Sequence, residues 1–420
     1  MFYKFNLRVL ILSCCLFAAG AYRGAVHTRP GHEEVEKQMR LFSDVFSIIS
    51  ENYVDDVDEV ELIQGAMKGM MRSLDSYSQF LDPEASELLK ADTEGEFGGL
   101  GIRITAKDEI ITVVTPLPDT PAYKLGISPG DRIVKINDES AIGLTLREAV
   151  TKLRGPEGTD VTISIDRDGE DEVLEFTITR EIIVPQKVYT DMLDGNIGYL
   201  RLVEFTEDAP EIMRQELSGL KEEGIEGLIL DIRNNPGGLL SSAIGITNVF
   251  IERGELVVYT QGRREDQNRR FYARRPPLAA DVPLVVLINR GSASGSEIVA
   301  GAIKDHGRGL ILGERTFGKA SVQSIIDLDD GSSLRLTTAR YYTPSGISIH
   351  KEGIEPDIKV ELTREIRRQI IEQQQEILGL SEEEHRRRQE EIVEDPQLTR
   401  AHDILLARRF FLLNDKENVQ

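Results

Sequence analysis

Two stretches near the beginning of the chain carry apolar residues at helical spacing. In the first, residues 32–50, the apolar positions fall on one side of a helix: Val35, Met39, Phe42, Val45, Phe46 and Ile49. In the second, residues 60–74, the corresponding positions hold Leu62, Met67, Met70 and Met71, and methionines in such a pattern are typical of core packing. The pattern predicts a helical segment over residues 32–91.

From residue 92 the chain changes to short apolar runs separated by Gly, Pro and Asp, which predicts a small β-rich domain over residues 92–181. We expect its strands at Leu100–Thr105, Ile110–Val114, Arg132–Ile136, Val161–Asp166 and Val173–Thr179. A helix, Leu146–Leu153, is expected between two of these strands.

Residues 182–360 alternate near-continuous apolar runs with amphipathic stretches. The runs Leu228–Ile232 and Leu284–Ile288 suit strands that are buried on both faces, and Ala209–Leu220 has the pattern of a helix beside them. The pattern predicts an α/β domain with a largely parallel sheet.

Residues 361–420 are rich in Glu, Arg and Gln, which predicts a charged helical tail that is exposed to solvent rather than part of a core. Its last helix, Leu398–Leu413, has enough apolar residues to dock on another surface, such as a second subunit.

Composition agrees with a folded protein of several domains. A length of 420 residues favours two or three domains, and 40% hydrophobic with 29% charged residues is typical of soluble globular proteins. The net charge of -22 disfavours binding to nucleic acid, because that partner requires a basic surface.

The first 26 residues have the features of an export signal peptide or membrane anchor. Lys4 and Arg8 precede an uncharged apolar run, Val9–Ala19, and cleavage after Ala21 competes with retention as an anchor. We therefore expect an exported protein of the periplasm or cell envelope. Both cysteines, Cys14 and Cys15, lie in this run, so a processed chain contains no thiol for a disulfide, a metal or a nucleophile.

The string Gly291–Glu297 follows the apolar run Leu284–Ile288 and opens a predicted helix. A serine in such a strand, turn and helix stands near free backbone N–H groups that can stabilise negative charge, which makes Ser294 a candidate nucleophile. A serine cap with Glu297 behind it explains the same string equally well.

The string Thr316–Gln323 places Lys319 between glycine and small residues after the apolar run Leu310–Gly313. A lysine can serve as a general base if burial lowers its pKa, and the uncharged neighbours allow that. A surface lysine in a hairpin is the commoner explanation of Lys319 taken alone.

A third string, Asp231–Gly238, ends the run Leu228–Ile232 and carries two glycines whose N–H groups suit an oxyanion hole. Gly237 and Gly295 would form the pair, although a plain turn explains the string as well. A Ser/His/Asp triad is the competing assignment for the chemistry. His306 stands at the expected end of the helix that Ser294 opens, where a histidine is normally structural. His350 is less easily dismissed, but it lies in a charged, turn-like stretch.

These three strings in this order resemble the carboxyl-terminal processing, or tail-specific, serine proteases, over roughly residues 53–357. The resemblance implies a catalytic core like that of ClpP and crotonase, with no metal or cofactor. It implies that Ser294 is the nucleophile, Lys319 the general base and Gln323 the residue that orients the lysine. It also implies an oxyanion hole from Gly237 and Gly295, where the family usually has alanine at position 295.

The β-rich segment resembles a PDZ domain. Its string Glu96–Ile102 looks like a carboxylate-binding loop, and Ala122–Ile133 looks like the helix, turn and strand of that domain, whereas a glycine turn before a strand is the commoner meaning of the first string alone. The resemblance implies that a peptide tail binds at these residues: Gly99, Leu100, Gly101, Ile102, Leu146 and Val150. Arg154 would couple the groove to the active site, although a turn arginine is the simpler interpretation.

The sequence therefore predicts an exported serine endopeptidase that recognises exposed, apolar protein C-termini through its PDZ domain and cleaves near them. Its partners would be protein or peptide substrates, with a homo-oligomer through the terminal helices or a regulatory adaptor left open. The alternatives are a tail-binding adaptor without catalysis and an exported scaffold that oligomerises.

Overall fold

The computed structural model describes residues 32–107, 109–377 and 394–417. It divides into two compact units, Met1–Met70 and Met71–Gln420, each of which is described by itself. The predicted export segment, residues 1–26, lies outside the described residues. No described helix is long and apolar enough to cross a membrane.

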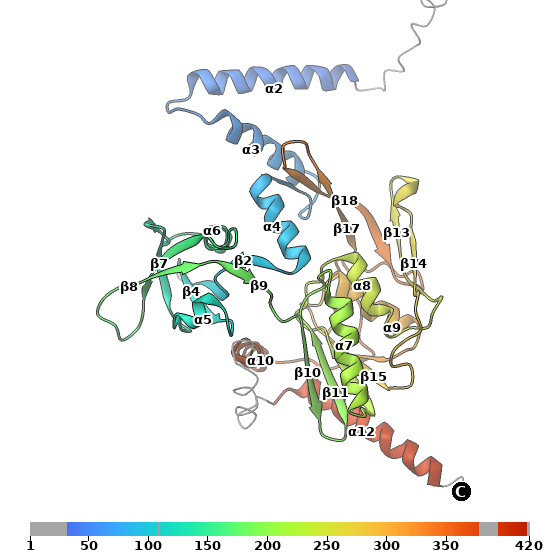
Figure 1. Ribbon diagram of the computed structural model, residues 1–420. Coiled ribbons are helices and arrows are strands. Elements are labelled where there is room, and N and C mark those ends of the chain that lie inside the picture. Colours follow the sequence, from blue (N-terminus) through green and yellow to red (C-terminus); the bar gives the residue numbers. More distant parts are fainter. Residues whose placement is uncertain (1–31, 108, 378–393, 418–420) are drawn as a thin grey trace, which may run out of the picture. The chain divides into compact units, whose positions relative to one another are not determined.

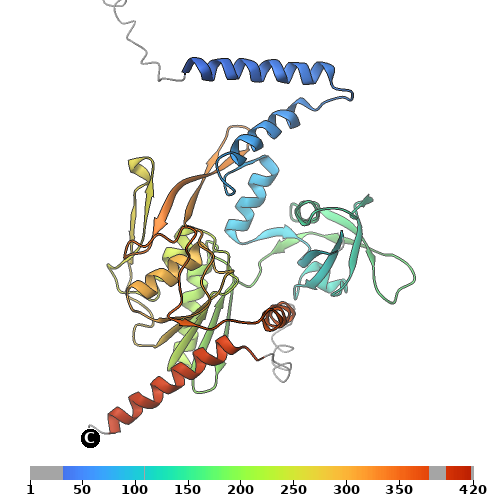
Figure 2. The same cartoon turned by 180° about the vertical axis from the view of Figure 1, so that it is seen from behind.

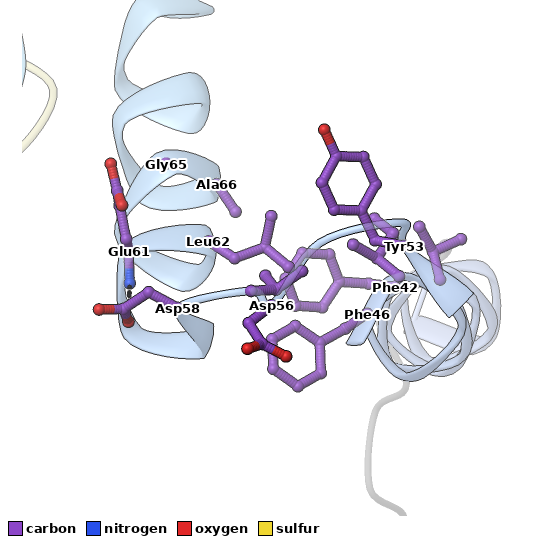
Figure 3. Close-up of a pocket in the computed structure, with 12 residues that line it drawn as sticks. Phe42, Phe46, Tyr53, Asp56, Asp58, Glu61, Leu62, Gly65 and Ala66 are labelled. Atoms are coloured by element: carbon purple, nitrogen blue, oxygen red, sulfur yellow. Dashed lines mark hydrogen bonds between the residues drawn. The ribbon is translucent and has the colours of Figure 1, made fainter. Parts of the chain in front are cut away.

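The first unit is a pair of helices, as the apolar spacing predicts. They are α2 (His32–Asn52) and α3 (Glu59–Arg72), and Asp58 starts α3 by accepting hydrogen bonds from the N–H groups of Val60 and Glu61. Between them lies an open groove whose apolar walls include Phe42 and Phe46 from α2 (Figure 3). Many apolar side chains of α2 are exposed, such as Met39 at 63%.

The β-rich domain contains a sheet in the order β3-β4-β5-β7-β8 with β6 on β5, which packs around a separate apolar core (Figure 1). Its elements are β3 (Ile102–Lys107), β4 (Ile110–Pro116), α5 (Pro121–Lys124), β5 (Arg132–Ile136), β6 (Glu139–Ser140), α6 (Leu146–Leu153), β7 (Asp160–Asp166) and β8 (Leu174–Thr179). The predicted bounds of β5 and α6 are confirmed. The first strand begins at Ile102, because Leu100 and Gly101 form the preceding loop.

Two short segments connect this domain to the rest of the chain. Helix α4 (Pro83–Glu94) precedes β2 (Phe97–Gly99), and β2 pairs antiparallel with β9 (Glu181–Ile183), so entry and exit of the domain are tied together.

The predicted α/β domain is built on a six-stranded sheet in the order β10-β11-β12-β15-β16-β19. Its strands are β10 (Val188–Leu193), β11 (Ile197–Leu202), β12 (Gly227–Asp231), β15 (Leu284–Ile288), β16 (Leu310–Gly313) and β19 (Ile358–Lys359). All neighbours are parallel except β10 and β11, so the predicted largely parallel sheet is confirmed.

Helices cover both faces of this sheet (Figures 1 and 2). On one face, α7 (Ala209–Glu222), α8 (Leu240–Thr247) and α9 (Gly295–Asp305) share a core with Leu228 and Leu230. On the other face, α12 (Pro396–Glu417) packs on Ile229. Alternate side chains of β12 thus point into the two cores on opposite faces of the sheet.

The start of α12 docks, as the apolar residues of the predicted last helix indicate, and the surface that it contacts is the sheet of its own chain. Ala401 is 0% exposed and Leu405 4%, and both pack against the sheet of their own chain. Single apolar residues among many charges form a buried stripe here, which composition alone does not reveal. Helix α10 (Arg364–Ile377) has the charged character that was expected.

A second, antiparallel sheet in the order β1-β18-β13-β14, with β17 also on β18, lies beside this core. Its strands are β1 (Gln79–Leu81), β13 (Leu256–Gly262), β14 (Arg270–Tyr272), β17 (Ser321–Asp327) and β18 (Ser333–Tyr342), with a 3-10 turn η1 (Glu265–Gln267) between β13 and β14. β1 lies within the stretch predicted to be helical, and it pairs with β18 of this second sheet.

Candidate active site

Ser294 occupies a strained turn between β15 and α9. Its φ is 53°, in the left-handed region that favours glycine, and such backbone strain costs about 1–3 kcal/mol for other residues. The turn leaves the side chain half-buried at the start of the helix. Strain at one residue is typical of functional sites, which keeps Ser294 a candidate nucleophile.

Glu297 ties this turn to the segment that carries Lys319. Its Oε2 accepts hydrogen bonds from the N–H groups of Ser294 (2.9 Å) and Lys319 (2.8 Å), and its Oε1 from Thr316 Oγ1 (2.6 Å) and the Gly318 N–H (2.7 Å). Glu297 is fully buried. Burial raises the pKa of its carboxyl, and the four hydrogen bonds oppose that rise. One carboxylate thus holds the candidate nucleophile and base side by side.

Tyr341 makes a second bridge between the same two residues. The phenol of this buried residue donates to the Lys319 carbonyl and also hydrogen-bonds the Ser294 side chain. Burial raises the pKa of Tyr341, so the phenol stays protonated. No local motif pointed to Tyr341, because its partners lie in other segments of the chain.

Lys319 has the electrostatic surroundings of a base. Burial lowers the pKa of its ammonium below the ordinary 10.5, and Arg335 lowers it further, whereas Glu297 partly opposes both. Its Nζ lies 4.8 Å from the centre of the Tyr77 ring. Among the described residues no hydrogen bond joins Nζ to Ser294 Oγ, so the proton transfer would require a rotation of the lysine side chain.

Gln323 lies on β17, where the strand has a bulge between Val322 and Gln323. Its Nε2 donates to Thr337 Oγ1 at 2.8 Å, and its buried Oε1 has no partner in the described structure. The predicted contact between Gln323 and Lys319 is therefore not formed, but the free Oε1 of Gln323 could accept a hydrogen bond from the lysine.

The two glycines of the predicted oxyanion hole lie against Ser294. A Cβ on Gly237 would lie 2.7 Å from Ser294 Cβ and 2.8 Å from the Gly295 nitrogen. The Gly237 N–H donates to Asn235 Oδ1 at 2.9 Å, whereas nothing in the described chain accepts from the Gly295 N–H. The Gly295 N–H is therefore free to donate to an oxyanion. The Gly237 N–H would first have to break its hydrogen bond to Asn235 Oδ1.

Polar side chains outside the predicted set fix the loops around this centre. Asn289 Oδ1 accepts from the Asn234 N–H at 2.9 Å, and Ser296 Oγ donates to the Asn235 carbonyl at 2.9 Å. Ser292 Oγ donates to the Ile232 carbonyl at 2.8 Å. These bonds hold the ends of β12 and β15 together, which keeps the glycine turn beside the nucleophile turn.

A buried ion pair holds the segment before α12 to the residues that precede the turn at Gly237. Arg233 contacts Asp231 at 2.6 Å and Asp395 at 2.7 Å, and it also donates to Gln397 Oε1 at 3.0 Å. Burial alone would raise the pKa of Asp231, but Arg233 holds it below its ordinary range. The start of α12 is thereby locked to the carboxyl end of β12.

Among the described residues, neither histidine of the competing triad forms a hydrogen bond with Ser294. His306 ends α9, at the opposite end of the helix from Ser294, and its Nε2 bonds the Leu256 carbonyl at 2.8 Å. His350 lies near Arg340 and Lys351, and burial and these charges lower its pKa. The described residues also contain no cluster of His, Cys, Asp and Glu that could hold a metal ion.

The predicted carboxylate loop has free donors. Gly101 has a φ of 75°, and a Cβ there would clash with Thr120, so the loop requires glycine. In the described structure no group accepts from the N–H of Leu100 or of Gly101. Gly99 pairs with Glu181 of β9, and Ile102 starts β3.

The predicted groove residues lie on neighbouring elements. α6 packs beside β3, and Leu146 (42% exposed) and the half-buried Val150 lie one turn apart on α6. Arg154 ends α6, pairs with Asp92 at 2.6 Å and lies 3.8 Å over the Phe97 ring. It contacts neither Ser294 nor Lys319 among the described residues.

Comparison with known proteins identifies the families that this chain resembles. Residues 196–360 match Peptidase family S41, residues 112–167 match the PDZ domain, and residues 20–85 match the activating protease CtpB N-terminal domain. Among solved structures, the photosystem II D1 C-terminal processing protease is 29% identical with a TM-score of 0.48, and it covers 81% of this chain and 97% of its own.

Curated relatives give the same result. The carboxy-terminal-processing protease of Bartonella bacilliformis is 46% identical over 338 residues, which cover 80% of this chain and 77% of the relative. The carboxy-terminal processing protease CtpA of Bacillus subtilis is 36% identical over 315 residues, which cover 75% of this chain and 67% of the relative. This chain belongs to the carboxy-terminal processing proteases, serine endopeptidases of family S41 that here carry a PDZ domain.

Proposed function

We propose that this peptidase cleaves proteins near their C-termini with a Ser/Lys dyad, in which Ser294 is the nucleophile and Lys319 the general base. The observation that carries the proposal is the Glu297 carboxylate, which accepts from the backbone N–H groups of both residues. Burial of Lys319 lowers its pKa, which favours the neutral amine that a base requires.

The chemistry follows from these groups. Neutral Lys319 takes the proton from Ser294 Oγ, and the oxygen attacks the scissile carbonyl to form a tetrahedral oxyanion. The free N–H of Gly295 stabilises this charge, joined by Gly237 once its N–H leaves Asn235. Lysine then protonates the leaving amine, and water releases the acyl group from Ser294.

The PDZ domain would select the substrate. The free N–H groups of Leu100 and Gly101 suit a terminal carboxylate, and the peptide would extend β3 as an added strand. Leu146 and Val150, partly exposed on α6, would contact apolar side chains of that tail. Recognition would therefore require both a free C-terminus and apolar final residues.

We further propose that the protein acts outside the cytoplasm, in the periplasm or cell envelope, on the features of residues 1–26. The exposed apolar side chains of α2 support contact with a second copy or a regulatory adaptor through this helix.

Cleavage of an unfolded protein with an apolar C-terminus tests the proposal. Wild type should cut it, whereas Ser294→Ala and Lys319→Ala should lose cleavage by at least about 1,000-fold. A substrate whose last residues are changed from apolar to charged should be cut more slowly, mainly through a raised KM. Undiminished cleavage by either variant contradicts the dyad, and no cleavage by any form favours a tail-binding adaptor.

A further inference from the structure

The loop that follows α3 approaches the candidate base from two sides. Asp75 holds this loop: its Oδ1 accepts from the N–H groups of Tyr77 and Ser78, each at 2.7 Å, and its Oδ2 from Ser78 Oγ at 3.0 Å. Burial would raise the pKa of the Asp75 carboxyl, but these hydrogen bonds hold it below its ordinary range. The carboxylate therefore stays charged and fixes the backbone of residues 75–78.

One side of the loop reaches Gln323 through Thr337. Ser78 is 3% exposed, and its Oγ accepts from the Thr337 N–H at 3.1 Å. Thr337 Oγ1 in turn accepts from Gln323 Nε2 at 2.8 Å. Because the amide nitrogen is held in this way, the amide oxygen remains buried and without a partner in the described structure. Leaving a buried acceptor unpaired is costly, and the role of Gln323 in the proposed mechanism makes the Lys319 amine the donor for which this oxygen is held.

The other side of the loop holds the lysine itself. The Lys319 Nζ lies 4.8 Å from the centre of the Tyr77 ring, within the range of a cation–π contact. Such a contact favours the charged amine, and so it opposes the effects of burial and of Arg335. Tyr77 thus fixes where the amine lies and resists its loss of a proton.

We propose that residues 75–78 form a positioning loop for the base, in which Tyr77 holds the Lys319 amine and Ser78, through Thr337, orients the Gln323 amide. The loop lies more than 100 residues before the stretch matched by Peptidase family S41. The inference rests on the proposed Ser/Lys mechanism, and none of the loop residues takes part in the bond changes.

Substitution of Tyr77 in the full chain tests the first contact. Tyr77→Leu removes the ring, so the rising limb of kcat/KM against pH should move to lower pH by about half a unit. Tyr77→Phe keeps the ring and should keep the wild-type midpoint. A midpoint that is unchanged in Tyr77→Leu, or that moves equally in both variants, overturns this part of the inference.

Substitution of Thr337 tests the second contact. Thr337→Val keeps the shape but removes the acceptor for Gln323 Nε2, so kcat should fall about five- to tenfold with KM unchanged. Thr337→Ser retains the hydroxyl and should recover most of the loss. A wild-type kcat in Thr337→Val, or an equal loss in Thr337→Ser, overturns the role of this bond.

Two further variants separate this inference from the proposed function. If Ser294→Ala and Lys319→Ala still cleave, the dyad itself is wrong. If both are inactive while Tyr77→Leu and Thr337→Val behave as wild type, the dyad stands and only the positioning loop is refuted.

Discussion

Replacement of Arg233 by methionine should destabilise the catalytic region strongly. Methionine keeps much of the apolar volume but leaves Asp231, which is 0% exposed, and Asp395, at 11%, without their cation. Removal of one partner from a buried ion pair costs about 3–5 kcal/mol, because the remaining charge stays out of water. This is a large share of the roughly 5–15 kcal/mol that stabilises an ordinary domain.

Urea unfolding followed by far-UV circular dichroism measures this effect, since the chain contains no tryptophan for fluorescence. The midpoint of the catalytic region should fall by about 1–2 M urea with an unchanged slope. Arg132→Met is the matched control, because its partners Asp166 and Asp168 are exposed, and its midpoint should change far less.

The pH dependence gives a second check with a definite sign. In the wild type the pKa of Asp231 lies below its unfolded value, so its contribution to stability is present above the unfolded pKa and is lost as pH falls through the folded one. Without Arg233 the burial raises the pKa of Asp231, so the variant's deficit should shrink as the solution is acidified from neutrality. A deficit below about 1 kcal/mol, or one that is independent of pH, would refute this reasoning.

Three other substitutions probe the turn around the nucleophile. Glu297→Ala leaves four hydrogen-bond donors without their acceptor, and the resulting displacement of Ser294 should lower kcat/KM by about 100-fold in steady-state assays. A wild-type kcat/KM would show that these four bonds do not position Ser294. Gly237→Ala places a Cβ 2.7 Å from Ser294 Cβ at a φ of 100°, so cleavage should be lost while the circular dichroism spectrum is retained, and an active variant would contradict the packing. Gly295→Ala places a Cβ 3.1 Å from the Phe205 ring but favours the helix, so urea unfolding should show a net change within about 1 kcal/mol. A loss of more than about 3 kcal/mol in the free energy of unfolding would show that the Phe205 ring cannot move aside.

Local features of the sequence predicted the elements that carry the site. β15 has the predicted bounds because Pro283 and Asn289 flank its apolar run, and β16 because its run lies between Gly309 and Gly313. α6 has the predicted bounds because Thr145 and Glu148 form a capping box at its start. The strings around Ser294 and Lys319 could be placed on these elements for the same reason.

Contacts between distant parts of the chain could not be predicted from the sequence. Glu297 was visible only as a cap residue, because its bonds to the Lys319 segment depend on how two strands lie together. The pairing of β1 with β18 and the docking of α12 through Arg233 depend on partners more than 150 residues apart. Such contacts leave no periodic pattern in the chain.

The pH dependence of kcat/KM tests the central claim most directly. For the full chain, with Ser294→Ala as the inactive control, the rate should rise with pH as one group loses a proton. The midpoint should lie below the ordinary lysine value of 10.5, because burial lowers the pKa of Lys319. Lys319→Ala should lack this limb altogether. A limb near the histidine value of about 6.5 that persists in Lys319→Ala would contradict the Ser/Lys account.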